Sequence, residues 1–236
     1  LNRLLKYTVN DSILLSNVLL SDAVMFEMLF PKEASFVVKA YEDFTLQSAT
    51  SIAERFGRDI GHISRVSSVA LEIYDKMKKL HGYKSRERTL LQVSAILQDI
   101  GKYVNVKNHA LLSYNTITNL DIVGINDHER LIIATVCYYH NGNIPSMDSP
   151  IYNQLSQEDR VMVSKLAAIL QISNAINTSH SPKFEQVSVN MKNGKLNIYL
   201  TTLKNINLEK WAFIAKSKLF REVYGLNATI IKRGVL

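Results

Sequence analysis

The middle of the chain carries apolar residues three and four positions apart, a spacing that predicts amphipathic helices packed into a bundle. The clearest stretch spans residues 86–102. Near its end lies Gly101, a residue type that commonly follows the last turn of a helix. Its apolar side is formed by Leu90, Val93, Leu97 and Ile100. Similar stretches span residues 129–140 and 161–177. With 236 residues and 47% hydrophobic content, the chain is long enough to bury a sizeable core of this kind.

Five predicted helices also direct one polar side chain towards the apolar interior. Asp99 lies in the last turn of its predicted helix, where the helix dipole disfavours a carboxylate unless a cation or a hydrogen-bond donor compensates. The other inward positions belong to different helices, and each shares a helical face with apolar residues one turn away. They are His62, His109, His140 and Asn174, the last followed one turn later by Asn177.

These polar positions have two interpretations that spacing alone leaves open. A single histidine on an apolar face is more often a hydrogen-bonded core residue than a metal ligand. Several inward polar side chains from separate helices favour a shared site instead. Imidazoles and a carboxylate are the usual ligands of a transition metal or of a dinuclear hydrolytic centre.

The order of these residues resembles a known superfamily. The series His62, Gln98-Asp99-Ile100-Gly101-Lys102, His109, Tyr139-His140 and residues 165–177 is similar to the HD phosphohydrolase superfamily. More closely, it resembles the C-terminal HD-type domain of the exopolyphosphatase/guanosine pentaphosphate phosphohydrolase family. The resemblance implies an HD-domain-like helical bundle over residues 32–181. Residues 1–31 resemble the strand and helix that leave the family's actin-like domain, and we interpret them as its remnant.

The pattern changes in residues 182–236, which we expect to form a small α+β subdomain. Apolar and polar residues alternate in residues 186–191 and 195–200, on either side of Asn193-Gly194, a strong hairpin signal. A predicted helix over residues 208–223 and a predicted strand over 227–232 follow. The predicted fold is therefore mainly α, with a C-terminal β-β-α-β appendage.

The chain departs from the superfamily pattern at the ligand positions themselves. Gln98 stands where the resemblance implies the histidine of the His-Asp doublet, and Asn174 and Asn177 stand where it implies aspartates. A neutral amide is a poor ligand for such metals. The resemblance leaves a vestigial set of possible metal ligands, namely His62, Asp99, His109 and His140.

Two outcomes follow from these replacements. Four remaining ligands could still hold one manganese, zinc or iron ion that activates water for attack on a phosphoryl group, with Lys102 neutralising the developing charge. Alternatively, Gln98, Asn174 and Asn177 complete a metal-free hydrogen-bond network around the histidines and Asp99. We favour the second outcome, with no cofactor, because loss of charge at several ligand positions is expected of a site relieved of its cation.

The charge balance favours anionic partners. The chain has 28 Lys and Arg against 21 Asp and Glu, a net charge of +7. Polyphosphate or a guanosine penta- or tetraphosphate would suit this charge, and nucleic acid is a minor alternative because no reader motif is present. Most lysines are simply solvated surface. The candidate anion-binding residues are Lys102, Lys107, Arg130, Lys165, His180 and Lys183.

The expected function combines these observations. In the family that the chain resembles, hydrolysis belongs to the actin-like domains with their glycine-rich phosphate loop, which has no counterpart among the nine glycines here. We expect a domain that is non-catalytic on its own, binds polyphosphate or a phosphorylated nucleotide, contacts those actin-like domains and supports a homodimer. The alternative is a metal-dependent HD-type phosphohydrolase. A single cysteine, Cys137, and no evident signal peptide or membrane span make the cytoplasm the expected compartment.

Overall fold

The computed structural model describes residue 28 and residues 35–192 and 194–234. The predicted remnant of a preceding domain, residues 1–31, lies outside the described residues except for Met28. The chain divides into two compact units, residues 1–41 and 42–236. Apart from residues 35–41, every residue discussed below belongs to the second unit. The boundaries predicted at residues 31 and 181 stay predictions.

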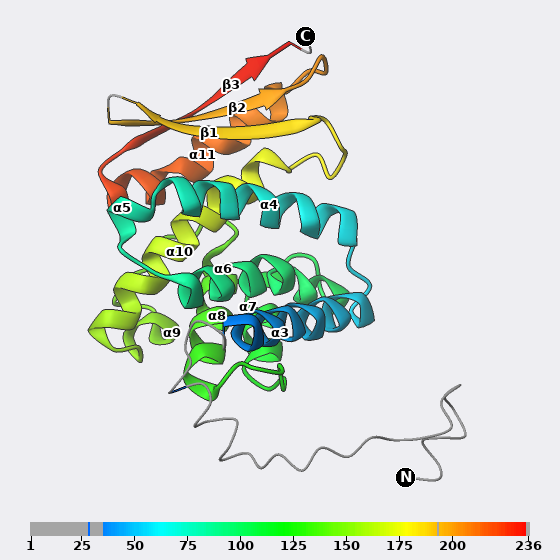
Figure 1. Ribbon diagram of the computed structural model, residues 1–236, viewed down its shortest axis with the longest axis vertical. Coiled ribbons are helices and arrows are strands. Elements are labelled where there is room, and N and C mark those ends of the chain that lie inside the picture. The colour runs from blue at the N-terminus through cyan, green and yellow to red at the C-terminus, as the bar shows by residue number, and fades with distance from the viewer. Residues whose placement is uncertain (1–27, 29–34, 193, 235–236) are drawn as a thin grey trace. The chain divides into compact units, whose positions relative to one another are not determined.

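Helices dominate the described residues, which confirms the expectation of a mainly α fold (Figure 1). A short 3-10 helix, η1 (Ile100–Tyr103), links two of the α-helices. The α-helices are α3 (Ser35–Arg55), α4 (Ile60–Lys76), α5 (Lys78–His81), α6 (Ser85–Leu97), α7 (His109–Ile117), α8 (Asp127–Tyr139), α9 (Pro150–Asn153), α10 (Gln157–Ile176) and α11 (Asn207–Tyr224).

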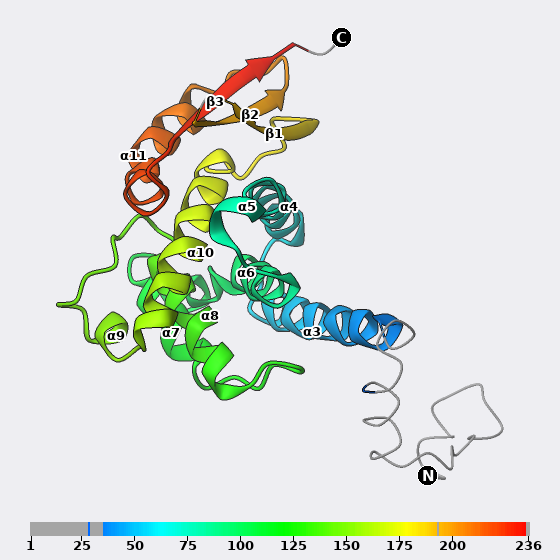
Figure 2. The same cartoon turned by 60° about the vertical axis from the view of Figure 1, so that its left-hand side comes forward.

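Local sequence signals begin two of these helices. Asn126 and Glu129 form a reciprocal capping box at the start of α8, and Ser156 accepts the backbone N–H of Asp159 at the start of α10. In α4, the apolar residues Ile63, Val66, Ala70 and Ile73 recur three and four positions apart, and all four are buried. The central helix is α10, which contacts α4, α6, α8 and α11 (Figure 2). Leu166 to Leu170 of α10 are completely buried because these neighbours cover the helix on several sides.

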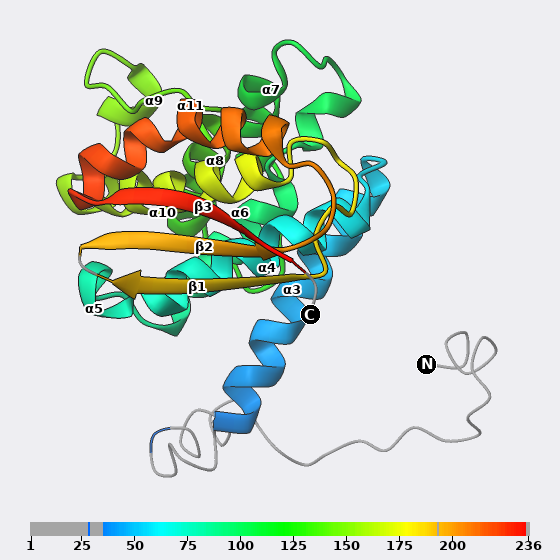
Figure 3. The ribbon, with the colours of Figure 1, turned by 90° about the horizontal axis from the view of Figure 1, so that it is seen from above.

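A three-stranded sheet completes the fold and confirms the β-β-α-β appendage. Its strands are β1 (Gln186–Lys192), β2 (Lys195–Thr201) and β3 (Asn227–Arg233), in the order β1-β2-β3. The hairpin pairs β1 with β2 antiparallel, and α11 then crosses over so that β3 pairs with β2 parallel (Figure 3). In this unit α11 packs on both α10 and β3, and β1 contacts α4. The appendage therefore lies directly against the helical bundle.

The helix predicted over residues 86–102 is wrong at its C-terminal end. The α-helix α6 stops at Leu97, and Asp99 follows it rather than lying in its last turn. Tertiary packing causes the early stop. The Ser113 hydroxyl accepts the N–H of Gly101 at 2.9 Å and donates to the carbonyl of Gln98 at 2.8 Å. A Cβ atom on Gly101 would lie 2.3 Å from the carbonyl oxygen of His109, so only glycine allows α7 to approach this closely.

No helix in the described part of the chain combines the length and apolar character needed to span a bilayer.

Candidate functional site

Three of the predicted ligands meet at the C-terminal end of α6. Asp99, His109 and His140 are all buried, and one ligand atom from each lies within 4.8 Å of the others. The Nε2 atoms of His109 and His140 are 3.3 Å apart. Asp99 Oδ1 lies 3.2 Å from His140 Nε2 and 3.6 Å from His109 Nε2. Three helical segments that are separate in sequence thus converge on one small volume.

Backbone carbonyls set the orientation of both imidazole rings. His109 begins α7, and its Nδ1 lies 2.7 Å from the carbonyl oxygen of Val106. His140 follows α8, and its Nδ1 lies 2.5 Å from the carbonyl oxygen of Cys137. Because a carbonyl oxygen only accepts, each Nδ1 carries the proton and donates it. In the neutral rings, both Nε2 lone pairs are therefore directed towards Asp99, an arrangement typical of metal-ligating histidines.

The carboxylate of Asp99 is the charged centre of this cluster. Lys102 Nζ lies 2.7 Å from its Oδ2, and Arg58 donates to its backbone carbonyl at 3.2 Å. Burial raises the pKa of Asp99, but the hydrogen bond and charge that His140 supplies in its protonated form, together with Lys102, outweigh burial and hold this pKa well below its usual range. Burial and the neighbouring His140 lower the pKa of His109, which favours its neutral, lone-pair-bearing ring. The Asp99 carboxylate is therefore ionised at neutral pH.

A pocket of about 300 Å³ opens beside Asp99 and contains buried polar groups without partners. His62 is 4% exposed, and neither ring nitrogen has a hydrogen-bond partner among the described residues. Gln98 is 1% exposed, and both its amide atoms also lack partners there. A buried polar group left unpaired costs about 1–3 kcal/mol. Buried groups of this kind are usually paired with ordered water or with a polar ligand.

His180 lines the same pocket and stacks on His62, with ring centroids 4.1 Å apart. Its backbone φ is +53°, a left-handed conformation that non-glycine residues seldom adopt and that is often found at functional sites. Burial, followed by the charge of His180, lowers the pKa of His62 to about 4. Both histidines therefore face the pocket, and His62 is neutral at neutral pH.

The predicted ligand set is thus divided by the structure. Asp99, His109 and His140 form the cluster, whereas His62 lies beside it as a wall of the adjoining pocket. Among the described residues, no hydrogen bond joins the Gln98 or Asn177 side chain to the histidines. Both amide atoms of Gln98 lack partners there, and Asn177 donates to the carbonyl of Ser173 in its own helix, while its Oδ1 accepts no hydrogen bond from that part of the chain. The expected amide network stays a prediction.

Two of the six candidate anion-binding residues lie in the pocket, namely Lys102 and His180. Lys107 is exposed outside its lining. The other three have partners elsewhere: Arg130 pairs with Asp127 at 2.8 Å, Lys165 lies over the ring of Tyr83, and Lys183 pairs with Glu209 at 2.9 Å.

Sequence reasoning missed three charged residues near the site. Arg58 and Asp59 line the pocket from the turn before α4, where Asp59 also caps the helix by accepting the N–H of Gly61 at 2.8 Å. Lys216 approaches from α11: burial lowers its pKa, and the charges of Asp99 and Lys102 also act on it. An N-cap aspartate at residue 59 was visible in the sequence. Nothing local marks Lys216, because only tertiary packing brings α11 to this end of the bundle.

The donor set of the cluster fits one divalent transition metal. Two imidazole nitrogens and one carboxylate oxygen are a typical three-ligand set that leaves a position open for water or substrate. Ligands about 2.0–2.2 Å from a tetrahedral ion lie about 3.3–3.6 Å from one another. The three distances in the cluster are 3.2, 3.3 and 3.6 Å. Asp99, His109 and His140 could therefore hold such an ion with little rearrangement.

Comparisons with known proteins cover this whole region. The family described as Ppx/GppA phosphatase, domain III, matches residues 46–219, a range that includes the cluster, the pocket and Lys216. A guanosine-5'-triphosphate,3'-diphosphate pyrophosphatase of Photobacterium profundum is 21% identical over 162 residues. That match covers 69% of this chain but 31% of the relative, so the chain corresponds to about a third of the relative's length.

Proposed function

The chain belongs to the Ppx/GppA phosphatase family, whose domain III it carries, and on this premise we propose that it is a binding module without catalysis of its own. Its pocket takes a terminal phosphoryl group of polyphosphate or of a highly phosphorylated nucleotide. The family and the pyrophosphatase relative support this class of ligand. Gln98 and Asn174, which stand where the resemblance implies metal ligands, support the absence of catalysis.

The unpartnered polar atoms of His62 and Gln98 carry this proposal. A phosphoryl group presents several acceptor oxygens, which can take hydrogen bonds from the Gln98 amide and from the N–H of the His62 ring. Lys102 and Arg58 line the same pocket and supply charge-assisted donors. Lys102 already neutralises Asp99 at 2.7 Å, which limits repulsion between that carboxylate and an anion.

Calorimetric titration of the full chain with inorganic tripolyphosphate tests this proposal. We expect binding that weakens about 10- to 100-fold in Lys102→Ala, since one charge-assisted contact is worth about 1.5–3 kcal/mol. Lys79→Ala, which removes an exposed lysine on α5, is the matched control and should bind like the wild type. No measurable binding, or an equal loss in both variants, would contradict a specific pocket.

The Asp99–His109–His140 cluster favours a second candidate, a metal-dependent phosphohydrolase. The Nε2 atoms of the two histidines and Oδ1 of Asp99 converge there. Asp99 Oδ1 accepts no hydrogen bond from the described residues. A bound divalent ion would supply an activated water and neutralise charge on a phosphoryl group. In this candidate, Asp99, His109 and His140 hold the ion, while Lys102 and Arg58 orient the anionic substrate in the adjoining pocket.

Elemental analysis separates the two candidates. Purified protein is analysed before and after incubation with manganese, zinc and iron, alongside a fluorogenic phosphodiester assay. The binding module predicts no turnover. About one metal per chain together with phosphate release would overturn it in favour of the phosphohydrolase. Asp99→Asn should then abolish both metal retention and turnover.

We also propose that the domain contributes to a homodimer and contacts further domains of its own protein. An exposed apolar stripe on α11 supports this, because contiguous apolar surface commonly marks an interface. It consists of Leu208, Trp211 and Ile214, which are 47%, 71% and 74% exposed. Light scattering of the wild type and of Trp211→Glu measures the solution mass. A dimer that the substitution dissociates is the expected result, and a monomeric wild type would contradict it.

A further inference from the structure

His180, one wall of the pocket beside Asp99, lies in a loop rather than in a helix. The loop covers residues 177–185 and joins α10 to β1. The ring of His180 stacks on that of His62 with 28° between the ring planes, and its backbone φ is +53°. A non-glycine residue keeps such a left-handed conformation only where its surroundings hold it. Contacts that fix this loop are therefore needed to keep His180 at the pocket.

Glu209 makes two such contacts from the appendage. It lies in the first turn of α11 and is completely buried. Ser179, which directly precedes His180, donates a hydrogen bond to its carboxylate. Lys183, three residues after His180, pairs with the same carboxylate at 2.9 Å. One buried carboxylate thus holds the loop on both sides of His180.

Other hydrogen bonds fix the main chain of the loop. Arg65 of α4 donates to the carbonyl of His180 at 3.4 Å, and Lys204 donates to the carbonyl of Pro182 at 2.9 Å. Each of these side chains holds the loop at one point, whereas Glu209 holds it at two.

The burial of Glu209 depends on its partners in the loop. Taking a carboxylate out of water costs free energy unless a charged and hydrogen-bonding environment compensates. Burial raises the pKa of Glu209, but Ser179 and Lys183 outweigh burial and lower this pKa, so the carboxylate is ionised at neutral pH. The positive end of the helix dipole favours the same charge in the first turn of α11. Neutralising Glu209 should therefore release the loop.

We infer that Glu209 is a positioning residue of the phosphoryl pocket, which holds His180 against His62 so that the His180 ring can donate a hydrogen bond to the anion. This role rests on the proposed function and extends it to α11. Glu209 is not among the residues that line the pocket, and its negative charge would repel an anion. Its contribution to binding is therefore made through His180.

The sign of the effect distinguishes positioning from a general charge effect. Glu209→Gln removes a negative charge, which by itself should strengthen the binding of an anion. Loss of positioning should weaken it. We expect tripolyphosphate to bind about two- to tenfold more weakly to Glu209→Gln than to the wild type, the range for loss of one hydrogen bond. Calorimetric titration of the full chain measures both affinities.

A double-mutant cycle tests whether Glu209 acts through His180. In a His180→Ala background the ring is absent, so adding Glu209→Gln should not weaken tripolyphosphate binding further. Ser179→Ala removes one contact of the loop without changing the net charge, and should weaken binding as Glu209→Gln does. It also carries the test if Glu209→Gln does not fold.

The position of the His180 ring can be measured independently of affinity. The two ring centroids are 4.1 Å apart, so histidine-labelled wild type should show a nuclear Overhauser effect between the ring protons of His62 and His180. Glu209→Gln should lose this signal while circular dichroism shows that it remains folded. A purely structural role of Glu209 would not produce that combination.

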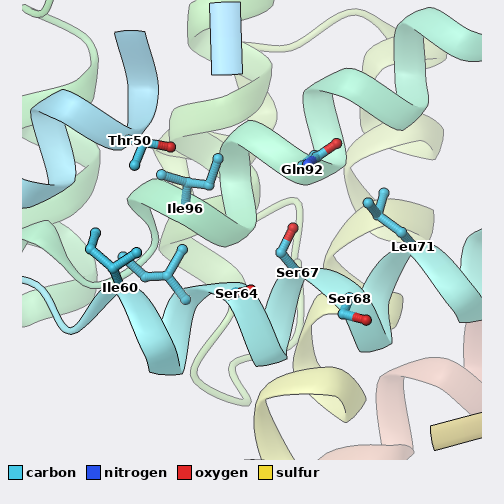
Figure 4. A pocket seen from close by; sticks show the side chains of 9 residues that line it. Thr50, Ile60, Ser64, Ser67, Ser68, Leu71, Gln92 and Ile96 are labelled. Atoms are coloured by element: carbon cyan, nitrogen blue, oxygen red, sulfur yellow. The ribbon is translucent and has the colours of Figure 1, made fainter. Parts of the chain in front are cut away.

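Two variants outside the phosphoryl pocket serve as controls. Glu129→Gln neutralises another largely buried carboxylate, which pairs with Arg86, and keeps a residue type suited to its capping box. Gln92→Leu changes a pocket of about 450 Å³ between α3, α4 and α6, whose lining among the described residues is uncharged (Figure 4). Both variants should bind tripolyphosphate like the wild type.

Each outcome has a separate meaning. Absence of tripolyphosphate binding by the wild type overturns the proposed function and the role of Glu209 with it. Unchanged or tighter binding in folded Glu209→Gln overturns only the role of Glu209. An equal loss in the His180→Ala background, a retained signal between the two rings, or an equal loss in Glu129→Gln does the same. Weaker binding in Gln92→Leu would place the anion in the other pocket and overturn both.

Discussion

Two buried histidines near opposite ends of α4 have contrasting surroundings. His81, in the short helix α5 after α4, and His62, in the first turn of α4, are both 4% exposed. The Nε2 of His81 lies 2.9 Å from the carbonyl oxygen of Tyr74, and its Nδ1 accepts the N–H of Tyr83 at 3.0 Å. Neither ring nitrogen of His62 has such a partner among the described residues.

This contrast concerns hydrogen bonding and not burial. His81 is fully paired by the fold, and its ring packs 4.1 Å from that of Tyr74. Its burial is therefore compensated within the domain. His62 has a stacked neighbour, His180, but leaves its hydrogen-bonding capacity to whatever enters the pocket. An equal degree of burial thus accompanies two different hydrogen-bonding environments, which fits the binding role that we propose for His62.

The largest effect should follow from removing the paired histidine. His81→Leu removes two hydrogen bonds of the ring. The Tyr74 carbonyl keeps the N–H of Met77 at 3.1 Å, but the Tyr83 N–H loses its partner, so the free energy of unfolding should fall by about 1–3 kcal/mol. Urea denaturation followed by circular dichroism measures this. A loss below about 1 kcal/mol would mean that the two hydrogen bonds contribute little and that the contrast with His62 is only geometric.

A smaller effect should follow from restoring charge and donor strength beside the cluster. Gln98→His combined with Asn174→Asp returns the two residue types that the resemblance implies, and should raise zinc affinity about tenfold, or about 1.4 kcal/mol. Competition with a zinc-chelating dye provides the measurement. Lys79→Ala is a control that should leave zinc affinity unchanged. An unaltered affinity in the double variant would show that the surrounding scaffold no longer supports the ancestral ligand positions.

The pH dependence of stability should carry the signature of His81. Burial lowers the pKa of His81 in the folded state, with the Tyr74 hydrogen bond opposing this in part. The folded protein therefore binds fewer protons than the unfolded chain as pH falls below about 6.5, and the unfolding free energy decreases in that direction. Between pH 8 and pH 5, the unfolding free energy of His81→Leu should decrease less steeply than that of the wild type. Parallel curves would contradict a neutral His81 in the fold.

The smallest change in stability should come from His62→Leu. This substitution breaks no hydrogen bond and replaces an unpaired buried polar group by an apolar one, so the unfolding free energy should change by less than about 1 kcal/mol and can rise. Tripolyphosphate affinity should nevertheless fall, which separates binding from folding. A destabilisation as large as that of His81→Leu would assign His62 a structural role and remove the comparison.

Most of the secondary structure was predictable because its causes are local. Apolar periodicity, the Asn126–Glu129 capping box and the Asn-Gly pair act over a few residues, and α8, α10 and the β1–β2 hairpin follow from them. The ring orientations of His109 and His140 have local causes too, because each Nδ1 bonds to the carbonyl three residues earlier in the chain.

The composition of the site depended on packing between distant segments. Gly101 and Ser113 stop α6 at Leu97, which separates Asp99 from the helix that its periodicity predicted. Crossover of α11 brings Lys216 towards Asp99, and Glu209 engages Lys183 away from the pocket. The spacing of residues in the sequence predicted His62, Asp99, His109 and His140 as possible metal ligands. It carries no information on which of their polar atoms meet. Only the three-dimensional arrangement decides which donors and acceptors meet. It brings Asp99, His109 and His140 into one cluster, and it leaves His62 and Gln98 without hydrogen-bond partners among the described residues.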